Sequence, residues 1–141
     1  MEVFKWDHPA HSAPAHLLPV CSHYGHILAL SVVSRGDDII VGDLMKSVCL
    51  LNYNDETETI SELARDYHPG WTTAVESLSD DVIIAGENSY NLYTLRKRTD
   101  GMTDDEKRRL EPVGCFHLGE FINKFRPGMC NVYEFELLII F

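Results

Sequence analysis

The sequence predicts an all-β fold, a partial β-propeller of about two four-stranded blades with flanking strands and a short inserted helix. One observation is a series of short β-branched segments separated by Gly, Asp and Asn turn signals. The other is an internal repeat: Asp37–Asp43 (DDIIVGD) aligns with Asp81–Glu87 (DVIIAGE) at a spacing of 44 residues. A period of that length, built from four short strands, is typical of a propeller blade. Such a sheet cannot bury its own faces, so neighbouring sheets must cover them.

Residues 1–25 are expected to hold the end of a preceding blade and an irregular loop. Val3–Trp6 is the one short extended piece, because Pro9, Pro14 and Pro19 interrupt regular structure after it.

Residues 26–69 are expected to form one blade, whose last strand alternates polar and apolar residues as a half-exposed outer strand does. The expected strands are His26–Ser34, Asp38–Gly42, Ser47–Tyr53 and Thr57–Arg65.

Residues 70–118 are expected to form a second blade with a helical insertion near 103–110. Its expected strands are Trp71–Leu78, Val82–Gly86, Ser89–Arg96 and Glu111–Leu118. Thr103 followed by Glu106 has the form of a capping box, which predicts a short helix over Glu106–Leu110.

Residues 119–128 are expected to contain the first strand of a further blade, at Glu120–Phe125, and residues 129–141 to form an apolar tail that matches nothing before it. A closed propeller needs roughly 4–8 blades. The sequence therefore indicates a fragment of a larger propeller protein, or a truncated product.

The composition excludes several classes of function. Twelve Lys and Arg against 22 Asp and Glu give a net charge of −10, which disfavours non-specific binding to nucleic acid or an anionic membrane. No apolar run approaches the ~20 residues of a membrane-spanning helix, and Met1–Trp6 is no secretory signal. The four cysteines form no CxxC pair, which favours a reducing compartment and buried thiols.

No catalytic or metal-binding motif stands out, and we expect neither an enzyme nor a cofactor. There is no phosphate loop and no nucleophile elbow. The Asp pairs 37–38 and 80–81 and the charge run 104–109 are typical of hairpin turns and of a solvated helix face. The spacing of a histidine-rich group fits no standard zinc site, so we expect no metal there. Its members are His8, His11, His16, Cys21, His23 and His26.

Aromatic and amide residues lie near the expected strand starts and turns, where a propeller binds partners. The alternative, which the residue types alone favour, is that they pack blade against blade. These residues are Trp71, Asn88, Tyr90, Phe121 and Asn123.

Several ordered motifs carry a family resemblance over about residues 20–126. They are Gly42–Val48 (GDLMKSV) with Ala64–Asp66 and Trp71, Cys21–Tyr24, Gly86–Asn88 with Asn91–Leu92, and Phe116–Phe121. The chain resembles a family of large propeller subunits that act in UV-damaged DNA binding, in splicing factor 3b and in cleavage and polyadenylation. The GDLM…SV run is similar to the damage-binding branch, the adaptor of cullin-RING ubiquitin ligases.

The resemblance implies a role as an adaptor linked to nucleotide-excision DNA repair, in the nucleus and also the cytoplasm. The family has three seven-bladed propellers. The first and third form a cleft for WD-repeat substrate receptors and their helical motifs, and the middle one docks the cullin. This chain resembles part of the third propeller, so cullin would bind only through propellers absent from it.

The resemblance also implies which residues line the cleft, whose apolar and aromatic floor would receive an amphipathic helix. They are Leu28, Leu30, Leu44, Trp71, Thr73, Ala74, Asn88, Tyr90, Phe121 and Asn123. The chain departs from the family pattern at Ser31, Lys46 and Lys124, which bears on partner choice.

Two alternatives remain open from the sequence. One is a nucleic-acid-binding propeller subunit of an RNA-processing or splicing complex, although the net charge makes only indirect contact with nucleic acid plausible. The other is a non-functional truncated product whose open strand edges favour aggregation.

Overall fold

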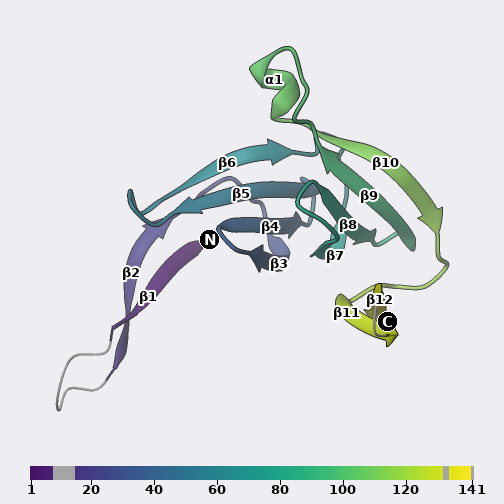
Figure 1. The fold of residues 1–141 in the computed structure, drawn as a ribbon, viewed down its shortest axis with the longest axis horizontal. Helices are drawn as coiled ribbons and strands as arrows, with labels where there is room; N and C mark the ends of the chain where they lie inside the picture. The colour runs from purple at the N-terminus through teal and green to yellow at the C-terminus, as the bar shows by residue number, and fades with distance from the viewer. Residues whose placement is uncertain (8–14, 132–133, 141) are drawn as a thin grey trace.

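The computed structural model describes residues 1–7, 15–131 and 134–140, and within these residues it contains twelve strands and one short helix (Figure 1). All the strand pairs are antiparallel. The strands are β1 (Glu2–Asp7), β2 (His16–Ser22), β3 (Ala29–Arg35), β4 (Asp38–Asp43), β5 (Val48–Asn54), β6 (Thr59–Arg65), β7 (Thr72–Ser77), β8 (Val82–Glu87), β9 (Asn91–Lys97), β10 (Leu110–His117), β11 (Lys124–Asn131) and β12 (Glu134–Ile140).

Two complete four-stranded sheets form the middle of the molecule, with the strand orders β3-β4-β5-β6 and β7-β8-β9-β10. The pair β1–β2 precedes them and the pair β11–β12 follows. The sheets follow one another around an arc, with β3 and β7 on the inside and β6 and β10 on the outside (Figure 1). This arrangement is a partial β-propeller, which confirms the predicted fold class.

The core lies between the sheets, as the repeat requires. One buried cluster joins Ile40 and Leu50 of the first sheet to Val75 and Ile83 of the second. The approach is close because Gly42 leaves room for the next sheet: a Cβ placed there would lie 2.8 Å from the Thr72 methyl group. Each complete sheet is therefore stabilised largely by its neighbours.

The segments that flank the two complete sheets use the same kind of contact. Ile122 and Phe125 are fully buried in a cluster with Ala74 and Ile84 of the second sheet. On the other side Met1 packs against the buried residues of β4 and β5. The side chain of Lys5 also bonds Asp55 and Glu58 in the β5–β6 turn, at 3.0 and 3.1 Å.

The expectation of an irregular segment after β1 is wrong for residues 16–22, which form β2. Pro19 is tolerated there because β2 is an edge strand, and it pairs with Phe4 where the register shifts between Val3 and Phe4. Pro9 and Pro14 lie outside the described residues.

Two strands begin three or four residues later than predicted. β3 begins at Ala29 rather than His26, because the backbone N–H groups of Ile27 and Leu28 bond a side chain instead of a strand. β11 begins at Lys124 rather than Glu120, since the chain turns at Gly119, which has a φ of +82°.

The C-terminal segment does not stop at residue 128 as an unpaired tail. β11 continues to Asn131, and β12 pairs with it from Glu134 to Ile140. The sequence repeat gave no signal for this pair: at the 44-residue spacing β12 falls on β9, but the two segments share no identical residue.

The predicted capping box is present, but the helix is earlier and shorter than expected. α1 covers Asp104–Lys107; the Thr103 side chain accepts the N–H of Glu106, whose carboxylate in turn accepts the N–H of Thr103. The insertion reaches the first sheet, because the N–H of Arg65 donates to the carbonyl of Arg108 at 2.9 Å.

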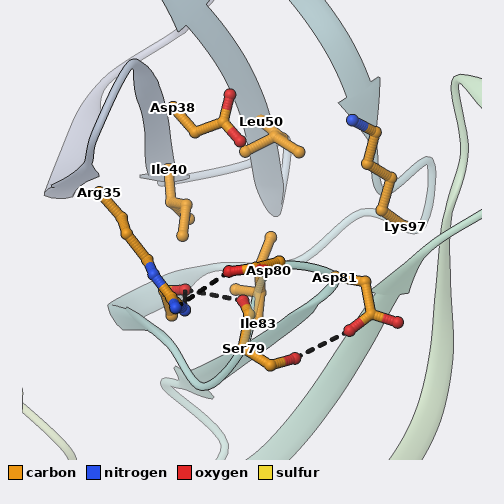
Figure 2. A pocket seen from close by; sticks show the side chains of 10 residues that line it. Arg35, Asp38, Ile40, Leu50, Ser79, Asp80, Asp81, Ile83 and Lys97 are labelled. Atoms are coloured by element: carbon orange, nitrogen blue, oxygen red, sulfur yellow. Dashed lines mark hydrogen bonds and ion pairs between the residues drawn. The ribbon is translucent and has the colours of Figure 1, made fainter.

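The predicted Asp pairs lie in or beside the turns between the first two strands of each sheet. A pocket of about 140 Å³ lies between these turns, and Arg35 crosses it to Asp80 at 3.0 Å and to the Ser77 hydroxyl at 3.1 Å (Figure 2). Asp38 accepts a hydrogen bond from Asn52 at 2.9 Å. These contacts are structural, as the turn prediction implied.

Candidate partner-binding site

The topology brings five connections to one end of the sheets. Strand direction alternates in an antiparallel sheet, so the loop before the first strand and the loop between the second and third strands meet at the same end. These connections cover residues 23–28, 44–47, 66–71, 88–90 and 118–123. Most of the ten predicted cleft residues lie in these loops, and the others lie close by on β3 and β7.

The same backbone contact builds this end in both complete sheets. In the first, the N–H of Leu44 donates to the carbonyl of Leu28 at 2.9 Å. In the second, the N–H of Asn88 donates to the carbonyl of Trp71 at 3.1 Å. The predicted residues therefore occupy equivalent places in consecutive blades.

Asp43 holds the two loops of the first sheet together. Its side chain is fully buried and accepts four backbone N–H groups, from Ile27 and Leu28 before β3 and from Met45 and Lys46 after β4, at 2.8–3.0 Å. Burial acts to raise the pKa of this carboxyl, but the four donors outweigh it and the pKa lies below its ordinary value. Asp43 is therefore an ionised anchor of the loops.

These loops present an exposed apolar surface that is interrupted by polar side chains. Trp71 is 45% exposed and Tyr90 is 47% exposed, and Leu28, Leu30 and Phe121 are exposed to a similar extent. The polar candidates Asn88 and Asn123 are exposed, and the apolar candidate Leu44 is half-buried. Exposed aromatic and aliphatic groups beside amides can hold the apolar face of a helix and bond its polar rim.

Two candidates are placed differently from the rest. Ala74 is not an exposed cleft-lining residue, because only 1% of it is exposed and it is covered by Ile122, in the loop before β11, and by Phe125 of β11. Thr73 is half-buried, and its hydroxyl is near the carbonyls of Ile122 (2.7 Å) and Gly86 (3.2 Å). Thr73 thus links the second sheet to the segment that follows it.

Sequence reasoning missed four large exposed residues in the same loops. Met45 and Ile27 are next to the predicted residues Leu44 and Leu28, and Tyr24 and Tyr67 lie in the loops before β3 and β7. The available signal was position: Tyr24, Met45 and Tyr67 lie between expected strands at the end where the chosen residues lie, whereas Ile27 was expected to lie within a strand. Composition gave no signal, since exposed and buried aromatic residues look alike in a sequence.

The histidine-rich group forms no metal site in the described part of the chain, where no three His, Cys, Asp or Glu residues are placed to hold an ion. The rings of His23 and His26 contact each other in a tilted arrangement, with centroids 5.6 Å apart and an interplanar angle of 55°. His8 and His11 lie outside the described residues.

The thiols are only partly buried. Cys49 is buried, and burial raises its pKa to about 12. Cys21 is half-buried and Cys115 is exposed, so the expectation of buried thiols holds for one of these three free cysteines.

None of the helices in the described residues is long and apolar enough to cross a membrane.

The fold and the loops at one end define a class of protein, a stretch of β-propeller of two complete blades and parts of two more. Residues 3–140 match the family model described as the CPSF A subunit region. The chain belongs to this family. The match includes residues 129–140, so the expectation of an unmatched tail is wrong for these residues.

Curated plant proteins are similar to most of the chain. It is 50% identical over 128 residues to DNA damage-binding protein 1 of Solanum lycopersicum, covering 91% of this chain. It is 56% identical over 108 residues to DNA damage-binding protein 1a of Arabidopsis thaliana, covering 77%. The chain spans only 12% and 10% of the lengths of these two relatives.

Proposed function

We propose that this chain is part of a scaffold that recruits WD-repeat substrate receptors to a cullin-RING ubiquitin ligase, linked to nucleotide-excision DNA repair. The observation that carries the proposal is the gathering of exposed apolar and amide side chains from consecutive blades at one end of the sheets. The names of the curated relatives support the link to DNA damage.

The arrangement suits a helical motif of a receptor. Leu28, Trp71 and Phe121 come from three successive loops before a first strand, so an amphipathic helix laid across them would meet an apolar side chain in each. Asn88 and Asn123 lie among them and would bond polar groups at the edge of that helix. Fixed loop backbones reduce the entropy lost on binding.

The proposed role requires no catalytic side chain. A scaffold raises the effective concentration of a substrate near the ligase, which is an effect of distance and geometry. Cullin would bind through propellers outside this chain, and the site of action would be the nucleus and also the cytoplasm.

The test is capture of the chain by an immobilised amphipathic helical peptide from a WD-repeat receptor. Trp71→Ala is expected to weaken capture about thirtyfold, because a central buried aromatic contributes about 2 kcal/mol to an interface. Phe116→Ala is the matched control, since Phe116 is an exposed aromatic on the outer strand β10.

Either of two outcomes would overturn the proposal. The first is that Trp71→Ala binds the peptide as tightly as the wild type. The second is that Phe116→Ala loses as much affinity for the peptide as Trp71→Ala. Strong, salt-dependent binding of the chain to damaged duplex DNA, without capture by the peptide, would favour the nucleic-acid alternative.

A further inference from the structure

A pocket of about 400 Å³ lies between the two complete sheets, beside loops that also carry the proposed receptor surface. One wall comes from the β4–β5 and β6–β7 loops of the first sheet, and the other from β8, β9 and β10 of the second. None of the ten predicted cleft residues lines it. Its size lies within the range of small-ligand sites.

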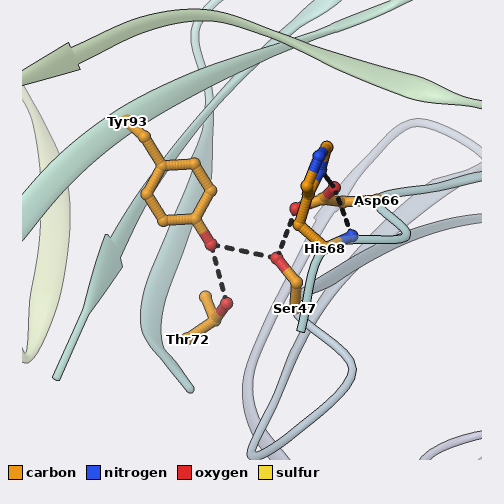
Figure 3. A network of polar contacts seen from close by, with 5 residues as sticks. All are labelled: Ser47, Asp66, His68, Thr72 and Tyr93. Atoms are coloured by element: carbon orange, nitrogen blue, oxygen red, sulfur yellow. Dashed lines mark hydrogen bonds and ion pairs between the residues drawn. The ribbon is translucent and has the colours of Figure 1, made fainter. Parts of the chain in front are cut away.

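Carboxylates from both sheets line the pocket. Asp66, with only 6% of its side chain exposed, is held by the Ser47 hydroxyl at 2.7 Å and by the N–H and ring Nδ1 of His68 at 3.0 and 2.8 Å (Figure 3). Glu87 lines the pocket from β8 of the second sheet and accepts a hydrogen bond from the side-chain amide of Asn91.

No lysine or arginine among the described residues lines this pocket. The protein therefore supplies no such cation inside the pocket to pair with the two carboxylates. His68 is the one basic lining residue, and it uses Nδ1 on Asp66. The His68 side chain is 77% exposed, so it covers Asp66 on the side that faces the solvent.

The remaining walls are apolar or hydroxyl-bearing. Leu95, Pro69 and Pro112 present carbon surface. The Tyr93 hydroxyl lies 3.2 Å from that of Ser47 and 2.8 Å from that of Thr72, and so ties the two sheets together behind the carboxylates (Figure 3). Burial raises the pKa of Tyr93, so its hydroxyl stays neutral.

We propose that this pocket binds an alkylguanidinium or alkylammonium group, a cation carried on a short apolar chain. The carboxylates bond the cationic head, for which guanidinium is well shaped, and the apolar walls cover the methylene stem. Such a group occurs in an arginine or lysine side chain of a protein partner and in free small amines. The net charge of −10 further favours a cationic ligand.

The pocket carries its own reporter, because Cys115 lines it and is exposed. Alkylation of each cysteine by iodoacetamide is followed by mass spectrometry of the 141-residue chain. Saturating butylguanidinium is expected to slow alkylation of Cys115 about fivefold or more by covering the thiol, and to leave Cys21, which is outside the pocket, unchanged. Butanol and butyrate at the same concentrations are expected to have little effect.

The charge is tested by Glu87→Gln, which keeps the shape and the acceptor for Asn91. It is expected to raise the butylguanidinium concentration for half-protection about tenfold, the effect of losing one charge-assisted hydrogen bond. Glu111→Gln is the matched control, because Glu111 lies on β10 outside the pocket and pairs with Arg98.

Two further arms distinguish the source of the cation. Protection by a capped arginine tripeptide at lower concentration than by agmatine indicates a protein side chain, and the reverse order indicates a free amine; either order supports the proposal. Equal alkylation of Cys115 with and without butylguanidinium would overturn it. So would equal protection by butanol, or unchanged protection in Glu87→Gln.

Discussion

The carboxylate of Asp43 accepts the backbone N–H of Leu28 at 3.0 Å, across the gap between two loops that are far apart in the sequence. The same side chain accepts the N–H of Met45 at 2.9 Å from the other loop. A single buried residue at the end of a strand thus fixes the backbone on which part of the proposed receptor surface is built.

Asp43→Asn is expected to lower the free energy of unfolding by about 2–3 kcal/mol, because an amide has one acceptor oxygen and turns its NH₂ toward N–H donors. Chemical denaturation measures this loss. Asp37→Asn, in an exposed turn, should change stability by no more than about 0.5 kcal/mol. Equal losses in the two variants would contradict the anchoring role of Asp43.

Acid should weaken the same anchor. The folded pKa of Asp43 lies below its ordinary value of 3.8, so its contribution to stability is full above pH 3.8 and is lost as the pH falls through the folded pKa. Denaturation curves at a series of acidic pH values are expected to show a steeper loss in the wild type than in Asp43→Asn. Parallel curves would count against this assignment.

Gly42→Ala tests the close approach of the two complete sheets. The new methyl group would lie 2.8 Å from the Thr72 methyl and 3.1 Å from that of Val75, so we expect a loss of about 1–3 kcal/mol in unfolding free energy. Gly70→Ala is the control, because a Cβ there meets Ser47 at an ordinary 3.6 Å. An unchanged unfolding free energy in Gly42→Ala would mean that the two sheets lie further apart.

The cysteines should differ sharply in reactivity at pH 8. The rise in the pKa of Cys49 from 9.0 to about 12 leaves about a thousandfold less thiolate, the form that reacts. Iodoacetamide should therefore modify the exposed Cys115 long before Cys49. Both should react when the chain is unfolded in concentrated urea. A native chain in which Cys49 reacts as fast as Cys115 would refute the buried position.

His26 should make the fold sensitive to mild acid. Both of its ring nitrogens are buried without hydrogen-bond partners among the described residues, and burial, with the neighbouring His23, lowers its pKa. The unfolded chain therefore takes up the proton first, and stability falls as the pH drops below 6.5. His26→Leu should flatten this dependence, whereas His117→Gln, at an exposed position, should preserve it.

The sequence predicted the two complete sheets because their pattern is local. The repeat from Asp37 to Asp43 and from Asp81 to Glu87 places turns and buried strands without knowledge of the rest of the chain. The strands at the edges of the fold were harder to predict. Pro19 indicates the end of a strand unless that strand is known to lie at the edge of a sheet, where proline is tolerated.

The candidate site was predictable in position but not in exposure. Trp71 and Ala74 were chosen together, yet the first is exposed and the second is covered by Phe125, which lies far along the sequence. The pocket beside Asp66 gave no sequence signal, since its walls meet only when two sheets pack. Both features depend on contacts that hydrophobic periodicity does not record.

The matching backbone hydrogen bonds from Leu44 to Leu28 and from Asn88 to Trp71 make the course of these loops independent of the side chains that they carry. Main-chain atoms make both bonds, so the loops can exchange leucine for tryptophan or asparagine and keep their course. New specificities could accumulate there residue by residue, while the framework that presents them stays the same.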